Sequence, residues 1–543
     1  MGIMNKLENF FIKLGEKRVG LSTWTLGFLG MVFFRCFIEQ FLTLVKPLVP
    51  YEAVIEYIHN FYFFSLAILL IWLFLSAILK ENPQKLSGVL IYSLLFLTFP
   101  PLIDMIKTGG EVYWSFYLFS TPRDLFWQYA TVFGHLPSAI VYFGTKIIFV
   151  ATVAVLFFLV WFRTKSFFKS IFTAWAVYSI LFFLGAFPSF FYYLYNFIFG
   201  SKKFLDIKAF EIFEFFGSLD KMAGINFQNI KYAVAYRLDF IYYIALVSLL
   251  AILFYRMDSK KFIAVVKNFR YPQLFYHSGL LFIGLAVGAW NYQQNFKLDL
   301  FSLLAVAVLF ISVWLAWKAS VVVNDLNDFT IDAISNPERP LQQGIFSREE
   351  YANLGWACFI LSILGGISIG FSFAVLLITY QVVAWVYSAQ PFRLKKFPLV
   401  ATFISSFALL LILFLGYILM SDNQTFHTLS PRIIFLMLIV GTISLSIKDF
   451  KDIAGDKKDN IWTIPVIFGE KKARLIVASG IFISFIASVF FLNELKLFWW
   501  AMFFGGLAFL SVASLKIKPR LIFWPVLGII FIYGLVMVRV LFF

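Results

Sequence analysis

Apolar residues dominate the chain in long runs that short polar segments interrupt. Many runs are about 20 residues long, which is enough for a helix to cross roughly 30 Å of hydrocarbon. The strict alternation of apolar and polar positions that a lipid-facing β-barrel strand requires is absent. The pattern therefore predicts an all-α polytopic membrane protein. The fifteen predicted spans lie near residues 20–43, 62–79, 86–104, 137–162, 170–195, 238–255, 274–291, 301–322, 352–369, 371–387, 400–419, 433–447, 472–492, 497–515 and 521–541.

Composition agrees with this pattern. Of 543 residues, 61% are hydrophobic and 14% are charged, whereas a water-soluble domain is about half apolar and about a quarter charged. A soluble enzyme is therefore excluded. Two cysteines in apolar runs are too few for a disulfide framework, and four scattered histidines show no metal-ligand spacing.

The distribution of positive charge predicts the topology. If the N-terminus lies in the cytoplasm, the loops that face inward hold most of the lysines and arginines, as the positive-inside rule expects. The exception is the long outward segment 196–237, and long loops are only weakly bound by the rule. Because the net charge of +16 arises from these loops, we expect contact with the lipid bilayer and no nucleic-acid partner. We predict an integral protein of a prokaryotic cytoplasmic (inner) membrane.

A basic stretch at 256–271 predicts a linker between two membrane domains. Residues 1–255 hold six predicted spans, and residues 272–543 hold nine. The first domain has no catalytic constellation, and its role stays unassigned. Only the second domain has clusters of acidic residues in its loops.

The first acidic cluster follows the span at 301–322. Asn324, Asp328 and Asp332 are four residues apart, with Asp325 adjacent, and this spacing would stack them on one face of a helix. The second cluster follows the span at 433–447 and contains Asp449, which Lys448 precedes. Its other members, at spacings of three and four, are Asp452 and Asp456.

Two one-faced rows of carboxylates at two helix ends could converge on one site. Unpaired, they would repel each other, and Mg²⁺ relieves such repulsion while sharing its oxygen ligands with substrate phosphates. An allylic diphosphate suits this site, because a metal ion and nearby cations stabilise the charge that develops as its C–O bond breaks. The alternative is that each cluster is a solvated loop. A calcium EF-hand is excluded, because neither cluster has the required ligand spacing.

Both clusters resemble the aspartate motifs of the UbiA superfamily of intramembrane prenyltransferases. The residues that carry the resemblance are Asn324-Asp325-x-x-Asp328-x-x-x-Asp332 and Asp449-x-x-Asp452-x-x-x-Asp456. The segments 336–340, Asn-Pro-Glu-Arg-Pro, and 463–469, Thr-Ile-Pro-Val-Ile-Phe-Gly, are also similar to the family, as is the basic loop 387–395. The family has nine transmembrane helices, which equals the number of spans predicted after residue 270.

The resemblance implies Mg²⁺-dependent transfer of a polyprenyl group from its diphosphate to a membrane-associated acceptor. The implied metal ligands are Asn324, Asp325, Asp328, Asp332, Asp449, Asp452 and Asp456, and the implied catalytic residues are Asp328, Asp332, Asp449 and Asp452. The implied contacts with the diphosphate are Arg339, Arg393, Lys395 and Lys448. Asp449 or Asp452 is also a candidate base for the acceptor. No nucleotide cofactor and no protein partner are predicted.

The segment 332–340 is most similar to enzymes that prenylate glycerol-phosphate lipids and to chlorophyll synthases. Gln342 and Gln343 depart from that pattern, so the acceptor stays open between a lipid precursor and an aromatic compound. Two further interpretations are a transporter or lipid flippase, whose ionisable groups would lie at mid-membrane depth, and a degenerate enzyme kept as a scaffold. Both aspartate motifs are complete, which favours an active enzyme.

Overall fold

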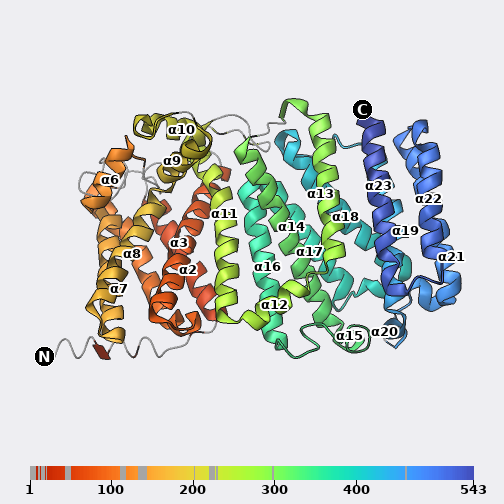
Figure 1. Ribbon diagram of the computed structural model, residues 1–543, viewed down its shortest axis with the longest axis horizontal. Coiled ribbons are helices and arrows are strands. Elements are labelled where there is room, and N and C mark those ends of the chain that lie inside the picture. Colours follow the sequence, from red (N-terminus) through yellow and green to blue (C-terminus); the bar gives the residue numbers. More distant parts are fainter. Residues whose placement is uncertain are drawn as a thin grey trace. The chain divides into compact units, whose positions relative to one another are not determined.

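The computed structural model consists of helices throughout the part of the chain that it describes (Figure 1). That part comprises residues 8–9, 13, 19, 21–42, 50–109, 118–132, 143–200, 202–218, 225, 227, 230–295, 299–458 and 461–542. No run of β-strand occurs within these ranges. In the same ranges, 14 helices are long and apolar enough to cross a membrane. The all-α polytopic fold predicted from the sequence is therefore confirmed.

Most predicted spans correspond to single helices. The span predicted at 86–104 is instead formed by α4 (Ser87–Ser93), the 3₁₀-helix η2 (Leu94–Thr98) and α5 (Phe99–Thr108), and residues 137–142 of the fourth predicted span lie outside the described residues. The first predicted span is the 22-residue helix α2 (Leu21–Leu42), which is not one of the 14. The prediction of one continuous span at 170–195 is wrong, because α8 (Phe167–Gly185) ends there and α9 (Phe187–Phe199) begins. Pro188 lies in the first turn of α9, where its missing N–H costs nothing, whereas inside a longer helix it would remove a hydrogen bond.

The chain divides into two compact units. Unit 1 contains Met1–Lys221 and Asn226–Phe262, and unit 2 contains Met222–Ile225 and Ile263–Phe543. The remaining helices of unit 1 are α3 (Pro50–Leu79), α6 (Pro122–Ala130), α7 (Phe143–Thr164), α10 (Ala209–Gly217) and α11 (Ile230–Met257). The predicted linker at 256–271 contains a further helix, α12 (Ser259–Lys267), where one unit ends and the other begins.

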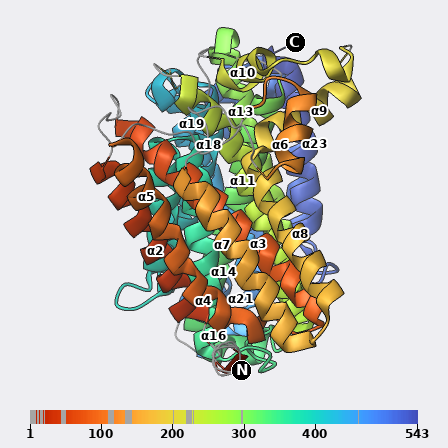
Figure 2. The same cartoon turned by 90° about the vertical axis from the view of Figure 1, so that its left-hand side faces the viewer.

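Unit 1 is built around α3, which packs against α11 and α8, while α8 also packs against α7 (Figure 2). Ionisable side chains lie inside this packing. The Nδ1 atom of His59 on α3 is 2.8 Å from Oδ1 of Asp239 on α11, and both side chains are almost fully buried. A contact between two ionisable side chains therefore joins two central helices of unit 1.

Unit 2 contains the longer helices that follow the linker. They are α13 (Tyr271–Asn291), α14 (Leu300–Asn327), α16 (Arg348–Ile369), α17 (Phe371–Ser388), α18 (Pro398–Met420), α19 (Pro431–Ser444), α21 (Ile464–Leu492), α22 (Phe498–Ala513) and α23 (Phe523–Phe542). The short helix α15 (Phe329–Ser335) follows α14. Between α19 and α21 lie the 3₁₀-helix η7 (Leu445–Lys451) and the short helix α20 (Ile453–Lys458).

In unit 2, α13 and α18 cross at very short distance. A Cβ atom on Gly284 would lie 2.1 Å from the carbonyl oxygen of Leu413, and one on Gly416 would lie 2.2 Å from that of Leu281. Only glycine permits this approach of two backbones, as is common where membrane helices pack. The crossing fixes the position of α13, whose N-terminal end contributes to the site described next.

Candidate functional site

Both acidic clusters lie at breaks between helices. Helix α14 ends at Asn327 and α15 begins at Phe329, so Asp328 occupies the junction. In the second cluster, Asp449 lies in η7 and Asp456 lies in α20. The prediction that each row follows one continuous helix is therefore wrong, because each helix breaks where its polar segment leaves the apolar span.

Short helices bring the two clusters together. Helix α15 packs against α20, and Gly455 is the point of closest approach, since a Cβ atom there would lie 2.5 Å from Oγ of Ser335. Asn336, just after α15, donates from Nδ2 to Asp332 at 3.1 Å and to Asp452 at 3.4 Å. This side chain therefore links the first aspartate cluster to the second.

The clusters face one cavity of about 210 Å³. Its charged lining, together with Asn324, is Asp328, Asp332, Asp449, Asp452, Asp456, Arg270, Arg339, Lys395, Lys448 and Lys451. Apolar and aromatic side chains from α13, α14, α17, α18 and α23 complete the wall. The cavity thus joins a charged region to an apolar one.

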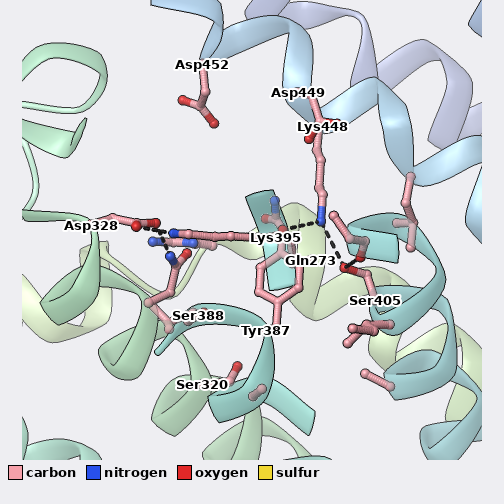
Figure 3. A pocket seen from close by; sticks show the side chains of 18 of the residues that line it. Gln273, Ser320, Asp328, Tyr387, Ser388, Lys395, Ser405, Lys448, Asp449 and Asp452 are labelled. Carbon is pink, nitrogen blue, oxygen red and sulfur yellow. Dashed lines mark hydrogen bonds and ion pairs between the residues drawn. The ribbon is translucent and has the colours of Figure 1, made fainter. Parts of the chain in front are cut away.

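Asp328 is the centre of one side of the cavity. Its carboxylate accepts hydrogen bonds from Lys395, Asn324 and, at 3.4 Å, from Nη2 of Arg393. Figure 3 shows Asp328 and Lys395 pointing toward each other, with Asp452 and Asp449 on a neighbouring segment. Burial lowers the pKa of Lys395, although the carboxylate of Asp328 opposes this effect. Arg393 itself does not line the cavity.

Asp325 has a different environment from the other aspartates. Its side chain is 1% exposed and does not line the cavity. Arg270 and Arg339 form ion pairs with it, and the Tyr351 hydroxyl donates at 2.9 Å. Asn268 adds a fourth donor at 3.1 Å. Asp325 therefore holds two arginines in place, and its predicted role as a metal ligand stays a prediction.

The linker before α13 is fixed to α14 by hydrogen bonds. The buried Lys318 ammonium donates to the carbonyl oxygen of Asn268 at 3.2 Å, and the Trp317 indole donates to that of Phe269 at 3.1 Å. Arg270 follows directly in a left-handed conformation, with φ 54°. These contacts place the Arg270 side chain between Asp325 and the cavity.

The second cluster contains the least satisfied carboxylates. Asp449 and Asp452 are half-buried, and the carboxylate of Asp449 makes no hydrogen bond or ion pair with any residue that the structure describes. Burial, together with the neighbouring Asp449 and Asp452, raises the pKa of Asp456 to about 8. Burial also raises the pKa of Asp332 to about 6. Without a bound cation these carboxyl groups resist simultaneous ionisation.

Within the described residues, no three acidic, histidine or cysteine side chains lie close enough to hold a metal ion as they stand. The residue types nevertheless suit a hard divalent cation. Mg²⁺ usually keeps several waters and binds through one or two carboxylates plus substrate phosphates, so it does not need a preformed protein cage. The cavity offers carboxylates for such a cation and basic groups for phosphate oxygens.

The structure adds residues that sequence reasoning missed. Arg270, Asn336, Tyr387 and Lys451 line the cavity or bridge its clusters. In the sequence, Arg270 is only one residue of the basic linker at 256–271, and Asn336 is only the first residue of the segment 336–340 that resembles the UbiA family. The remaining predicted residues, apart from Asp325 and Arg393, all line the cavity. Their individual roles are not tested by this placement.

Comparison with known proteins finds similarity in the second half of the chain. The family model described as "UbiA prenyltransferase family" matches residues 280–523. A digeranylgeranylglyceryl phosphate synthase of Methanothermobacter thermautotrophicus is 30% identical over 188 residues, which is 35% of this chain and 63% of that protein. A chloroplast chlorophyll synthase of Avena sativa is 29% identical over 195 residues, which is 34% of this chain and 50% of that protein.

A digeranylgeranylglyceryl phosphate synthase of Methanobrevibacter smithii is 28% identical over 184 residues and is matched over 62% of its length. The chain thus spans about half to two thirds of the length of these curated relatives. Among solved structures, a UbiA homolog from Archaeoglobus fulgidus bound to GPP and Mg²⁺ is similar at a TM-score of 0.39 and 19% identity. That similarity covers 51% of this chain and 100% of the other.

Proposed function

We propose, because residues 280–523 match the UbiA prenyltransferase family model, that this protein transfers a polyprenyl group between membrane-associated substrates. The donor is an allylic polyprenyl diphosphate, the acceptor is a lipid precursor or an aromatic compound, and diphosphate is released. The supporting observation is that five carboxylates and five basic side chains face one cavity between polar and apolar walls.

The site residues divide into two groups in this proposal. Asp328, Asp332, Asp452 and Asp456 would hold Mg²⁺ through their carboxylate oxygens, with Asn324 beside them, and Asp449 is left to take a proton from the acceptor. When bound, Mg²⁺ neutralises the charge that builds up on the departing diphosphate. Lys395 and Arg339 contact the diphosphate oxygens, with Arg393 supporting Asp328 from outside the cavity. Arginine suits bidentate contact with phosphate, whereas lysine acts as a point charge.

The chemistry of transfer follows from this arrangement. The allylic C–O bond breaks and its electron pair leaves with the diphosphate, while the acceptor nucleophile bonds to the allylic carbon. The acceptor loses one proton, and Asp449 is the proposed recipient, because its carboxylate lines the cavity and has no partner within the described part of the chain. The apolar wall holds the prenyl tail and keeps water away from the reacting carbon.

The position of the charges supports an enzyme over a transporter. In unit 2, Asp328 follows the end of α14 and Asp449 lies in the 3₁₀-helix after α19. A transport path would need ionisable groups at mid-membrane depth instead. We further propose that the site faces the cytoplasm at the inner membrane of a prokaryote, since the inward loops carry the excess of basic residues.

The decisive experiment is turnover of radiolabelled geranyl diphosphate by the purified full-length protein with a panel of acceptors. We expect release of diphosphate that requires Mg²⁺ and that Asp328→Ala abolishes. Glu349→Gln, a change to an exposed acid outside the cavity, is the matched control and should keep full activity. Turnover that persists in Asp328→Ala, or that is unaffected by removal of Mg²⁺, would overturn the proposal.

A further inference from the structure

One cation in the cavity differs from the others in its partners. The cavity is lined by five basic side chains, and four of them are paired with carboxylates. The fifth, Lys448, forms no ion pair with any residue that the structure describes. A positive charge inside a cavity without a paired carboxylate attracts an anion strongly, because little water screens it there.

Lys448 points away from the carboxylates of its own segment. Its ammonium donates to the Tyr387 hydroxyl at 3.0 Å and to Oγ of Ser405 at 3.0 Å. Figure 3 shows Tyr387, Ser405 and Gln273 around the end of this side chain, while Lys395 meets Asp328 on another part of the cavity. The two lysines therefore serve different places in the same cavity.

Donors remain available around Lys448. An ammonium group has three N–H donors, and two of them are used by Tyr387 and Ser405. Ser405 donates its own hydrogen to the carbonyl oxygen of Ala401 at 2.9 Å. Tyr387 accepts from Lys448, so its hydroxyl hydrogen is free to donate elsewhere. One N–H of Lys448 and the O–H of Tyr387 thus form an adjacent pair of donors, which matches the oxygens of a phosphate.

We propose that Lys448 and Tyr387 form a second anion site, distinct from the diphosphate side of the cavity, that binds the phosphate head group of the acceptor. This inference rests on the proposed function, and it names the acceptor class as a phosphate-bearing lipid alcohol. The apolar lining next to the pair supports a lipid. Ile404, Ala408 and Leu409 lie near Ser405 on α18 and also line the cavity, so an alkyl chain can extend there from a head group at Lys448.

The test is a pair of binding measurements on the full-length protein in detergent. The first measures dodecyl-glycerol phosphate and phosphate-free dodecyl-glycerol without Mg²⁺ or prenyl diphosphate. We expect the wild type to bind the phosphate form about tenfold more tightly or better, as a charge-assisted hydrogen bond provides. Lys448→Met should remove this preference, Lys448→Arg should restore most of it, and Tyr387→Phe should reduce it about threefold to tenfold.

The second measurement uses geranyl diphosphate with Mg²⁺, and Lys395→Met is the matched control. Lys395→Met should weaken geranyl diphosphate binding and keep the preference for the lipid phosphate, whereas Lys448→Met should do the reverse. Equal wild-type binding of the two dodecyl-glycerols, or loss of geranyl diphosphate binding in Lys448→Met, would overturn the assignment. If Lys448→Met unfolds, Tyr387→Phe decides the same question.

The two proposals fail in different ways. If the wild type neither binds nor consumes geranyl diphosphate, the prenyltransferase proposal falls, while the preference for lipid phosphate is still measured directly. If geranyl diphosphate is consumed only with neutral aromatic acceptors, the prenyltransferase proposal stands and the assignment of Lys448 is wrong.

Discussion

The two units bury charged side chains in different ways. In unit 1, His59 contacts Asp239 between α3 and α11, and Lys231 forms an ion pair with Glu56 at 3.3 Å between the same helices. In unit 2, Asp325 is equally enclosed by Arg270 and Arg339. The aspartates around it, by contrast, face a cavity and leave carboxylate oxygens available.

This comparison separates charges that hold helices together from charges that are ready to bind a ligand. A buried pair contributes little when intact, since desolvation offsets attraction, but removing one partner leaves an uncompensated charge. A carboxylate at a cavity has water or a ligand as its alternative partner. Substitution of a buried aspartate that is paired with protein groups should therefore lower stability. Substitution of an aspartate that faces the cavity should instead lower activity.

The largest expected effect comes from breaking enclosed pairs. Asp325→Ala leaves Arg270 and Arg339 without their shared carboxylate and should lower the free energy of unfolding by about 3–5 kcal/mol. Asp239→Ala removes its hydrogen bond with His59 in unit 1 and should cost about 1–3 kcal/mol. Thermal unfolding in detergent measures this. A melting temperature within about one degree of the wild type for Asp325→Ala would contradict the view that Asp325 is enclosed for structural reasons.

Substitution at the cavity should spare the fold and remove activity. Asp452 is half-buried, and its nearest basic group is Lys451 at 3.8 Å, so Asp452→Asn leaves little buried charge unpaired. We expect prenyl transfer to fall at least about a hundredfold, as for loss of one group that stabilises developing charge. The melting temperature should stay close to that of the wild type. Normal turnover would remove Asp452 from the site.

A smaller effect is expected from forcing the two clusters apart. Gly455→Ala would place a Cβ atom 2.5 Å from Oγ of Ser335, which pushes α20 away from α15 and costs about 1–3 kcal/mol of stability. Transfer should fall about tenfold, because the carboxylates no longer converge. The control is Gly528→Ala on α23, where a Cβ atom meets nothing within 4 Å. Equal behaviour of the two variants would show that the close packing of α15 and α20 is unimportant.

The smallest effect concerns pH. The pKa of Asp456 is raised to about 8 by burial and by its acidic neighbours, so between pH 6 and 8 the unfolded state has lost a proton that the folded state retains. Stability of the Mg²⁺-free protein should therefore fall as pH rises through this window, by about 1–2 kcal/mol. Added Mg²⁺ should remove the dependence. Unfolding curves at several pH values, with and without Mg²⁺, measure both; a stability that rises with pH would refute the assignment.

Much of the architecture was determined by the sequence alone. Runs of about 20 apolar residues can satisfy their backbone hydrogen bonds in a membrane only as helices, so nearly every span was predictable without knowing its neighbours. The aspartate clusters were visible for a related reason, because charged residues are rare in such a chain and their spacing is easily seen. The sequence did not predict the end of α8 before Pro188, since a single proline can begin a helix or interrupt one.

The partner of each charge was decided only by the tertiary structure. Asp325 and Asp328 are three residues apart and share one motif, yet one is surrounded by arginines and the other faces the cavity. The same holds for Lys448, which precedes an aspartate in sequence but contacts a tyrosine and a serine from two other helices. Electrostatic energy depends on distance and burial in three dimensions, and neither is fixed by position along the chain.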